Sequence, residues 1–530
     1  MALLLASCGG PDADAPGQGL VASSGQVKVQ DGPVQDTSTY AAARLLDQAS
    51  WGPTPAAIEQ VKRLGLAGWI DGQLSTPVTT LNAPNYVISF DSVNQQASRQ
   101  ANNWMLRRFY DVSISGADQL RQRVSWALYN YIPVNTQPYA TIEYFNMLQR
   151  HSLGTYKDLL RAVSLNPAMG VFLNNDQNQA AANNENFARE LMQLFSVGLV
   201  MLNSDGSVQR TARGTPIETY TQRDVVQATK ALTGWTTTWE PNLPTSNYMN
   251  GGKPMVPRQW PEGSHDTSAK TVLGRSMAAG QTVQQDLESL LDILVNHPNT
   301  APFVSRRLIQ SLVTSDPSAD YMTRVVTVFR QSQGDLKQVV RAILLDPEAR
   351  TADVIGQSTP KVGKIKEPML HWVGTLRGLG CKAAVMQWNA PTEVISTWTQ
   401  EPYRAPNVFG YFSPGHKAPE SLLASPEIRL LSGNEINRRL TPFNWWKDQE
   451  VQPYRDAGCE IAAFEAAART SDTALLQLIN DRFFRGAMSP TLKNGALNIL
   501  KTELSQYTPA QRTGFILQLL LGTPSYGVVR

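Results

Sequence analysis

Apolar residues recur at intervals of three and four along most of the chain, which is the spacing of one face of an α-helix. The first such face consists of Ala42, Leu45, Leu46 and Ala49. The segment 51–55, Trp-Gly-Pro-Thr-Pro, ends this helix and caps the next one. Because the alternation typical of strands is scarce, we expect the folded chain to open with a helix-turn-helix hairpin.

The same periodicity predicts helices along most of the remaining chain. Their ranges are 104–110, 119–131, 142–151, 157–164, 184–196, 222–232, 283–296, 300–314, 319–330, 336–345, 367–379 and from 473 to the end. The stretches 236–280 and 388–426 lack this pattern, and long unpatterned segments in compact proteins are usually functional or mobile loops. The expected fold is mainly α, with helical lobes at 38–235 and 285–530, a long loop region at 236–284, and little or no sheet.

The N-terminus, MALLLASCGG, ends its apolar run in a pattern that resembles a lipobox with Cys8 as the lipidated residue. Residues 1–8 are shorter than a working signal peptide, so we expect a truncated signal followed by a flexible tether at 9–37. No later apolar run approaches the roughly 20 residues that span a bilayer. These features predict an exported protein in the periplasm, outer membrane or cell surface, held at the membrane only through the lipid on Cys8.

Composition and motifs exclude several classes of function. A net charge of +3 over 530 residues, without a run of Lys and Arg, does not indicate a nucleic-acid partner. The sequence holds no phosphate loop, no nucleophile elbow and no dinucleotide fingerprint. Cys381 and Cys459 could form a disulfide or remain two separate buried thiols. The five His residues lack the spacing of a metal site, so no cofactor is expected.

Several ordered blocks resemble the bacterial domain-of-unknown-function family 1800. They are LDQASWGPT from 46, NPAMGVFLNN from 166, NNENFARELMQLFSVGL from 183, YTQRDVVQATKALTGW from 220, HDTSAKTVLG from 265, HPNTAPFVSRRLI from 297 and GDLKQVVRAILLDPE from 334. The resemblance implies a secreted, largely helical protein, often encoded beside a sulfatase-like partner, without an agreed activity. Ser268 stands where the family favours Gly, which bears on the loop after Asp266.

The predicted helix at 184–196 has one wholly polar face, formed by Glu185, Asn186, Arg189, Glu190 and Gln193. This face is either a solvated surface with a Glu185–Arg189 pair or a polar site built of groups that bind sugars and peptides. In the second case Glu190 is the candidate general acid.

The loop Ser264–Lys270 carries a second candidate group, with His265 as a base, Asp266 as an orienting or acidic carboxylate and Lys270 as a cation for substrate. A local hydrogen-bonding role is the alternative. Asp266 with Asn174, Asn175 and Asp176 would offer oxygen ligands to Ca²⁺, although a dedicated metal site is not expected.

Both groups lead to one hypothesis about the site. We expect Ser264–Lys270 to fold over the helix with Glu185 and Glu190, with Asn174 and Asn175 on the same side and Met169 and Leu173 buried. Arg189, Asn174, Asn175, Asn186 and Lys270 would bind substrate, and Trp239 and Trp260 would stack on it.

Two functions remain open at this point. The first is acid/base hydrolysis of an extracellular polymer such as a polysaccharide, which requires two carboxylates roughly 5 to 9.5 Å apart. The alternative is a non-catalytic surface lipoprotein that binds a polymer or the sulfatase-like partner.

Overall fold

The computed structural model describes residues 37–84, 95–136, 138–238, 253–355, 363–387, 390–394, 399–421, 423–447 and 451–529. Residues from Asp36 to the C-terminus form one compact unit. Cys8, most of the expected tether at 9–37 and Trp239 lie outside the described residues. The expected lipidation and tether therefore stay predictions.

The expected N-terminal hairpin is confirmed. Helix α1 (Thr39–Ala49) is followed by α2 (Pro55–Ser75), with Ser38 and Thr54 capping the two helices. Gly52 in the turn has a φ of 130°, and a Cβ at this position would lie only 3.0 Å from the Cα of Gly374. The turn therefore needs glycine both for its backbone angle and for the close approach of a later helix.

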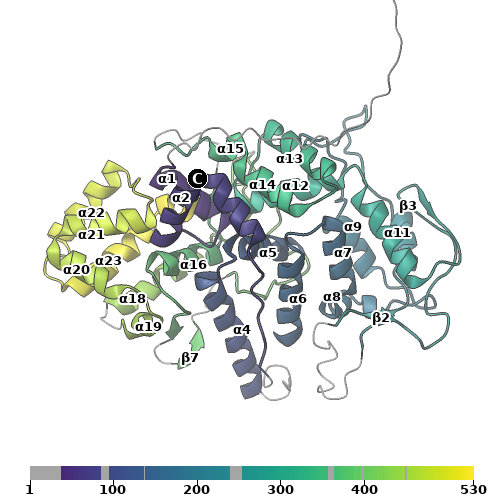
Figure 1. The fold of residues 1–530 in the computed structure, drawn as a ribbon, viewed down its shortest axis with the longest axis horizontal. Helices are drawn as coiled ribbons and strands as arrows, with labels where there is room; N and C mark the ends of the chain where they lie inside the picture. Colours follow the sequence, from purple (N-terminus) through teal and green to yellow (C-terminus); the bar gives the residue numbers. More distant parts are fainter. Residues whose placement is uncertain are drawn as a thin grey trace, which may run out of the picture. The chain divides into compact units, whose positions relative to one another are not determined.

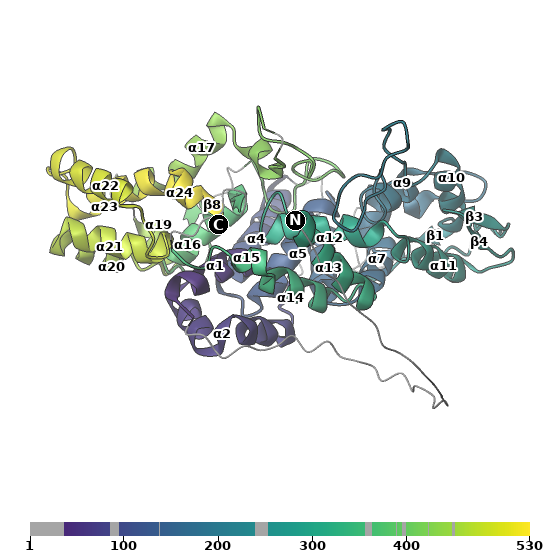
Figure 2. The ribbon, with the colours of Figure 1, turned by 90° about the horizontal axis from the view of Figure 1, so that it is seen from above.

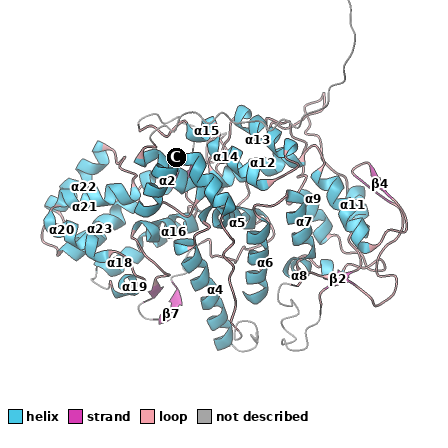
Figure 3. Cartoon of the chain, viewed as in Figure 1, coloured by secondary structure: helices cyan, strands magenta, loops and turns pink. Residues whose placement is uncertain are grey.

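Helices dominate the described residues, as Figure 3 shows. The longer ones after the hairpin are α4 (Gln95–Ser115), α5 (Gln119–Tyr131), α6 (Pro138–His151), α7 (Tyr156–Leu165), α9 (Asn186–Gln193), α10 (Gln222–Ala231), α11 (Val283–Val295), α12 (Thr300–Leu312), α13 (Ala319–Gln331), α14 (Leu336–Leu345) and α16 (Pro368–Gly378). The C-terminal ones are α17 (Gly433–Leu440), α20 (Ile461–Thr470), α21 (Asp472–Phe483), α22 (Pro490–Thr502) and α23 (Pro509–Leu521).

Short elements join these helices. They are α8 (Pro167–Phe172), η1 (Asn175–Gln177), α15 (Pro347–Arg350), η3 (Pro426–Leu430), α18 (Pro442–Lys447), α19 (Gln452–Asp456) and α24 (Pro524–Gly527). The strands form two-stranded antiparallel pairs: β1 (Trp235–Thr236) with β2 (Val256–Pro257), β3 (Lys270–Val272) with β4 (Arg275–Met277), β5 (Lys364–Ile365) with β8 (Val528–Val529), and β6 (Met386–Gln387) with β7 (Ala390–Val394). The expectation of a mainly α fold with little sheet is confirmed.

Helix α5 lies at the centre of the unit, where it packs against α1, α2, α6 and α12 (Figure 1). Its apolar side chains join an aromatic cluster in which Trp126 lies 5.6 Å from Trp51 and 5.5 Å from Phe109, measured between ring centroids. Of the two arginines on this helix, Arg121 and Arg123, Arg123 is fully buried. Helix α14 contacts α1 and α2, and α12 contacts α5, so helices of the two expected lobes pack against each other. The division into two lobes stays a prediction.

Two groups of helices extend from this centre. The C-terminal helices α20, α21, α22 and α23 pack against one another, and α9, α10 and α11 gather with β3 and β4 (Figure 2). Cys381, just after α16, and Cys459, just after α19, form a disulfide bond, which settles the two alternatives for these residues. No described helix combines the length and the hydropathy of a membrane-spanning segment.

Three charged side chains form an ionic cluster in the interior. The Nζ atom of Lys364 lies 3.2 Å from Oε1 of Glu367 and 2.9 Å from Oε1 of Glu427, and all three side chains are almost completely buried. Oε2 of Glu367 accepts further hydrogen bonds from Trp126, Asn130 and Gln400. One ammonium group therefore bridges two carboxylates, and the neighbouring Arg123 offsets the second negative charge.

This cluster predicts acid sensitivity. Burial alone would raise the pKa of Glu367, but Lys364, Arg123 and the hydrogen bonds lower it from 4.5 to about 2. Because the folded-state pKa lies below the unfolded value, this carboxylate stabilises the fold above pH 4.5, and its contribution is lost as the pH falls from about 4.5 to 2. Denaturant titrations across this range should show falling stability in the wild type and a shallower fall in Glu367→Gln. Equal slopes would contradict the prediction.

Candidate functional site

The polar face of α9 forms a small hydrogen-bonded network with the start of α10. The Arg189 guanidinium donates to Oε2 of Glu185 at 2.7 Å and to Oε1 of Gln222 at 3.1 Å. The Gln222 amide donates to the same Glu185 oxygen at 2.8 Å. Since Glu185 and Arg189 are 34% and 38% exposed, the network lies at the surface and is open to ligands and solvent.

Glu190 lies one turn further along α9 in a different environment. Burial raises the pKa of its carboxyl, and the nearby Arg189 lowers it only in part. Its Oε2 atom has no hydrogen-bond partner among the described residues. Neighbouring Tyr220 donates its hydroxyl proton to Oε1 of Gln193 at 3.2 Å. Glu190 is therefore a partly buried acid with a raised pKa, and its Oε2 atom is buried without a hydrogen-bond partner among the described residues.

The segment before α9 partly meets expectation. Met169 and Leu173 are buried, as predicted. The Asn186 amide donates to Oδ1 of Asn174 at 3.2 Å, so Asn174 reaches the Glu185 helix. Asn175 is 1% exposed, and neither polar atom of its side chain has a described partner.

The His265 loop is held by a buried carboxylate that the sequence analysis did not identify. Asp286, in the first turn of α11, is completely buried, and its Oδ2 lies 2.8 Å from Nζ of Lys270 and 3.1 Å from Nε2 of His265. Lys270 and Asp286 form an ion pair, and neither contact of Oδ2 has the alignment of a good hydrogen bond. The Nδ1 atom of His265 faces the carbonyl of Thr233 at 2.9 Å. Both ring nitrogens thus face protein groups, which favours the local structural role for His265.

Asp266 is also engaged within its own loop. The Ser268 N–H donates to Oδ1 of Asp266 at 2.9 Å, and Nζ of Lys230 lies 3.5 Å from Oδ2. Burial raises the pKa of Asp266, but the Ser268 hydrogen bonds and the two lysines, Lys230 and Lys270, bring it below its ordinary value. Ser268 does not adopt a positive φ, so the loop accommodates serine where the family favours glycine.

Helix α10 contacts both candidate groups. Glu185 binds Gln222 at the start of α10, whereas Asp266 faces Lys230 eight residues later, a separation of about 12 Å along the axis. The Ala180 N–H donates to the Ser264 carbonyl at 2.9 Å, which ties the loop to the chain before α9. Among the described residues no hydrogen bond or ion pair joins Glu185 or Glu190 to His265 or Asp266. The expected shared pocket stays a prediction.

The remaining candidates are spread over the surface and the core. Trp260 is 76% exposed, and Trp235 is buried. Within the described part of the chain, no three His, Cys, Asp or Glu side chains are grouped to hold a metal ion.

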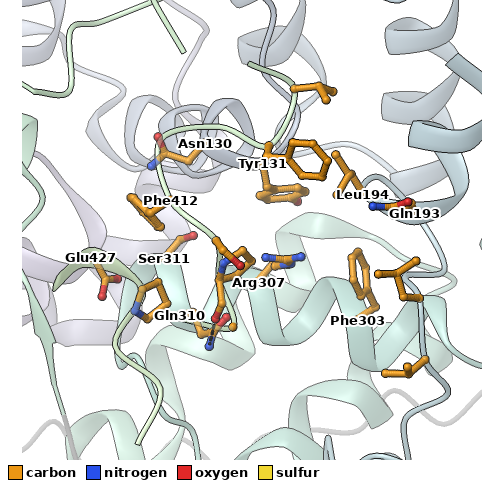
Figure 4. Close-up of a pocket in the computed structure, with 18 residues that line it drawn as sticks. Asn130, Tyr131, Gln193, Leu194, Phe303, Arg307, Gln310, Ser311, Phe412 and Glu427 are labelled. Atoms are coloured by element: carbon orange, nitrogen blue, oxygen red, sulfur yellow. Dashed lines mark hydrogen bonds between the residues drawn. The ribbon is translucent and has the colours of Figure 1, made fainter. Parts of the chain in front are cut away.

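A pocket of about 420 Å³ lies where four distant segments meet (Figure 4). Its walls are the end of α5, the end of α9 with residues that follow it, one side of α12, and the segment 408–415 with Glu427. Apolar and aromatic side chains predominate, among them Leu194, Phe303 and Phe412. The exposed side chains of Leu199 and Phe409 contribute to its lining.

Arg307 is the charged group that distinguishes this pocket, which we call the Arg307 pocket. Its half-buried guanidinium makes no hydrogen bond or ion pair with any described residue and lies 4.9 Å from the ring centroid of Phe303. Burial lowers its pKa to about 10, and of its charged neighbours Arg306 adds to this effect. Glu427 also lines the pocket, but Lys364 and Ser315 already bind its carboxylate. Among the described residues, Arg307 therefore has no acidic partner.

Two further polar atoms at the pocket lack partners. Gln310 is 6% exposed and donates its amide to the carbonyls of Ser315 and Pro414, at 2.9 and 3.3 Å, which leaves Oε1 as an unused acceptor. The hydroxyl of Tyr131 has no well-formed hydrogen bond.

Sequence reasoning missed this pocket, although one signal was present. Arg307 follows Phe303 by four positions and Val304 by three, so its side chain lies on the apolar face of the helix. An arginine at such a position either pairs with a buried acid or faces a cavity.

The chain belongs to the family described as protein of unknown function (DUF1800), whose sequence profile matches residues 44–528. No curated protein and no solved structure matched the chain.

Proposed function

We propose that this protein is a binding protein whose Arg307 pocket takes up an anionic group carried on an apolar body. The observation that supports this proposal is the guanidinium of Arg307, which is half-buried among apolar side chains and has no counter-ion in the part of the chain that the structure describes. A desolvated charge is unfavourable unless it is paired, so a ligand that supplies the anion makes this arrangement favourable. The planar fork of arginine suits carboxylate, sulfate and phosphate groups.

The size of the pocket supports the same proposal. Its volume of about 420 Å³ falls within the usual range of sites for small molecules or for one end of a larger chain. The predominance of aromatic and aliphatic lining favours a ligand whose body is itself aromatic or branched. A heavily hydroxylated body would lose hydrogen bonds with water that these walls do not replace.

The setting we propose for this binding is outside the cytoplasm. A disulfide such as Cys381–Cys459 is typical of oxidising compartments, and lipidation at Cys8 would hold the protein at a membrane surface. The ligand would then be an extracellular polymer or a segment of a partner such as the sulfatase-like neighbour that the family resemblance implies.

The aromatic sulfonate 8-anilinonaphthalene-1-sulfonate is a suitable probe, because it combines an anion with an apolar body. We expect saturable fluorescence enhancement with the folded wild type, and affinity about 10- to 100-fold lower in Arg307→Gln because a charge-assisted contact is lost. The neutral probe N-phenyl-1-naphthylamine should bind both proteins within about twofold.

Arg275→Gln is the matched control, since Arg275 is an exposed arginine outside the pocket. Circular dichroism melting should confirm that each variant folds. Equal sulfonate affinity in Arg307→Gln and wild type would overturn the proposed function.

A second candidate function is acid/base hydrolysis of an extracellular polysaccharide at α9. It is favoured by Glu190, whose raised pKa suits a general acid, with a second carboxylate at Glu185 in the residue before α9. If it operates, screening against neutral and sulfated polysaccharides should reveal cleavage that Glu190→Gln abolishes while stability changes by less than about 1 kcal/mol.

Glu218→Gln is the control for this experiment. Glu218 is exposed and lies near Tyr220, and its side chain makes no hydrogen bond with the described residues of α9. Retention of cleavage by Glu190→Gln would eliminate this candidate. It would leave the binding function untouched.

A further inference from the structure

A second cavity adjoins the Arg307 pocket. This second cavity, of about 490 Å³, shares with the first a wall that contains Leu199, Val200, Phe303 and Arg307. Because the two cavities share this wall, we treat them as one groove with two compartments. Such a groove is longer than one small ligand requires, which points to an extended occupant.

The two compartments differ in charge. The first is mainly apolar, whereas Arg306 and Lys417 line the second together with Asp316. Arg306 has acidic neighbours in Asp316 and Asp205, but Lys417 makes no ion pair with the described residues. The groove therefore offers two uncompensated cations, Arg307 where the compartments meet and Lys417 in the second. Its occupant should carry anionic groups next to an apolar one.

The positions of the charges indicate which kind of chain fits. Arg307 lies in the wall that the two compartments share, and Lys417 lines only the second compartment. A polypeptide can place carboxylates at two separate positions beside an apolar side chain, whereas a lipid carries its anionic group at one end of its acyl chain. The exposed side chains of Leu199 and Phe409, 55% and 53% accessible, add apolar contact area along the groove. An acidic glycan would gain little from them.

We propose that the groove binds an extended acidic polypeptide segment. A bulky apolar side chain of this segment fills the Arg307 pocket, and carboxylates reach Arg307 and Lys417. This inference rests on the proposed function and adds the chemical class of the ligand.

Selection of a phage-displayed random dodecapeptide library on the full-length protein tests the inference. We expect enrichment of sequences in which Asp or Glu lies next to Phe, Trp or Leu. Synthetic, fluorescein-labelled forms of these peptides should displace 8-anilinonaphthalene-1-sulfonate. Their affinity should fall roughly tenfold in Lys417→Glu, while the affinity for the sulfonate itself stays within twofold because it occupies only the first compartment.

Lys501→Glu, which reverses an exposed charge elsewhere, is the matched control and should bind the peptides like the wild type. Failure to enrich acidic peptides, or equal peptide affinity in Lys417→Glu and Lys501→Glu, would overturn the inference. Displacement of the sulfonate by oligogalacturonate but not by the peptides would overturn it in favour of an acidic glycan. In each case Arg307-dependent sulfonate binding reports separately on the proposed function.

Discussion

Replacing Lys364 with methionine should lower the free energy of unfolding by about 3 to 5 kcal/mol. Lys364 contacts the carboxylates of Glu367 and Glu427 at 3.2 and 2.9 Å, in a region where all three side chains are excluded from water. Without the ammonium group, the two buried carboxylates lose the cation that contacts both of them, and only the more distant Arg123 offsets their charge. Equilibrium denaturation in urea at pH 7 measures the loss directly.

The effect should reach the Arg307 pocket as well. Lys364 also donates to the carbonyl of Ser311 at 2.9 Å, and both Ser311 and Glu427 line the pocket. Weaker binding of the aromatic sulfonate is therefore expected even where Lys364→Met remains folded. Lys337→Met, at an exposed position of α14, is the control and should change stability by less than about 0.5 kcal/mol. A similarly small change in Lys364→Met would show that the cluster is not needed for stability.

Local periodicity explains why so many helices could be predicted. Helices such as α5, α12 and α14 have apolar residues on one face with a period of about 3.6 residues. The first and last residues of these helices lie within two positions of the predicted ones. The irregular pairing between residues 199 and 219 was not predicted, because Val200–Glu218 and Leu202–Val208 are isolated bridges in a polar segment without strand-like alternation. Turn-rich segments of this kind carry little periodic signal.

The candidate sites could be predicted only where their parts lie close in the sequence. The Glu185–Arg189 pair is one helical turn long, and the sequence indicates it directly. Asp286, which holds His265 and Lys270, comes from a helix some 20 residues later whose position depends on tertiary packing. The Arg307 pocket is harder still, because its walls come from segments as distant as Asn130 and Glu427. Sequence reasoning finds unusual residues, but packing decides which of them share a cavity.

Opening the disulfide between Cys381 and Cys459 should lower the free energy of unfolding by about 4 kcal/mol. The bond joins residues 78 positions apart, and in the chain-entropy description it restricts the unfolded state by closing that loop. It also holds the end of α16 against the turn after α19, where the Lys382 N–H donates to the Ala457 carbonyl at 2.8 Å. Guanidinium denaturation of the wild type with and without dithiothreitol, compared with the Cys381→Ala/Cys459→Ala variant, measures the loss.

The variant itself provides the control, because dithiothreitol should leave its denaturation curve unchanged while shifting that of the wild type. Neither cysteine lines the Arg307 pocket. Under conditions where both forms are folded, we therefore expect the reduced protein to bind the aromatic sulfonate with unchanged affinity. A drop in stability of less than about 1 kcal/mol would contradict the loop-closure argument. Loss of sulfonate binding in the folded, reduced protein would instead show that the pocket depends on the position of α16, the helix that begins immediately after Glu367 of the buried cluster.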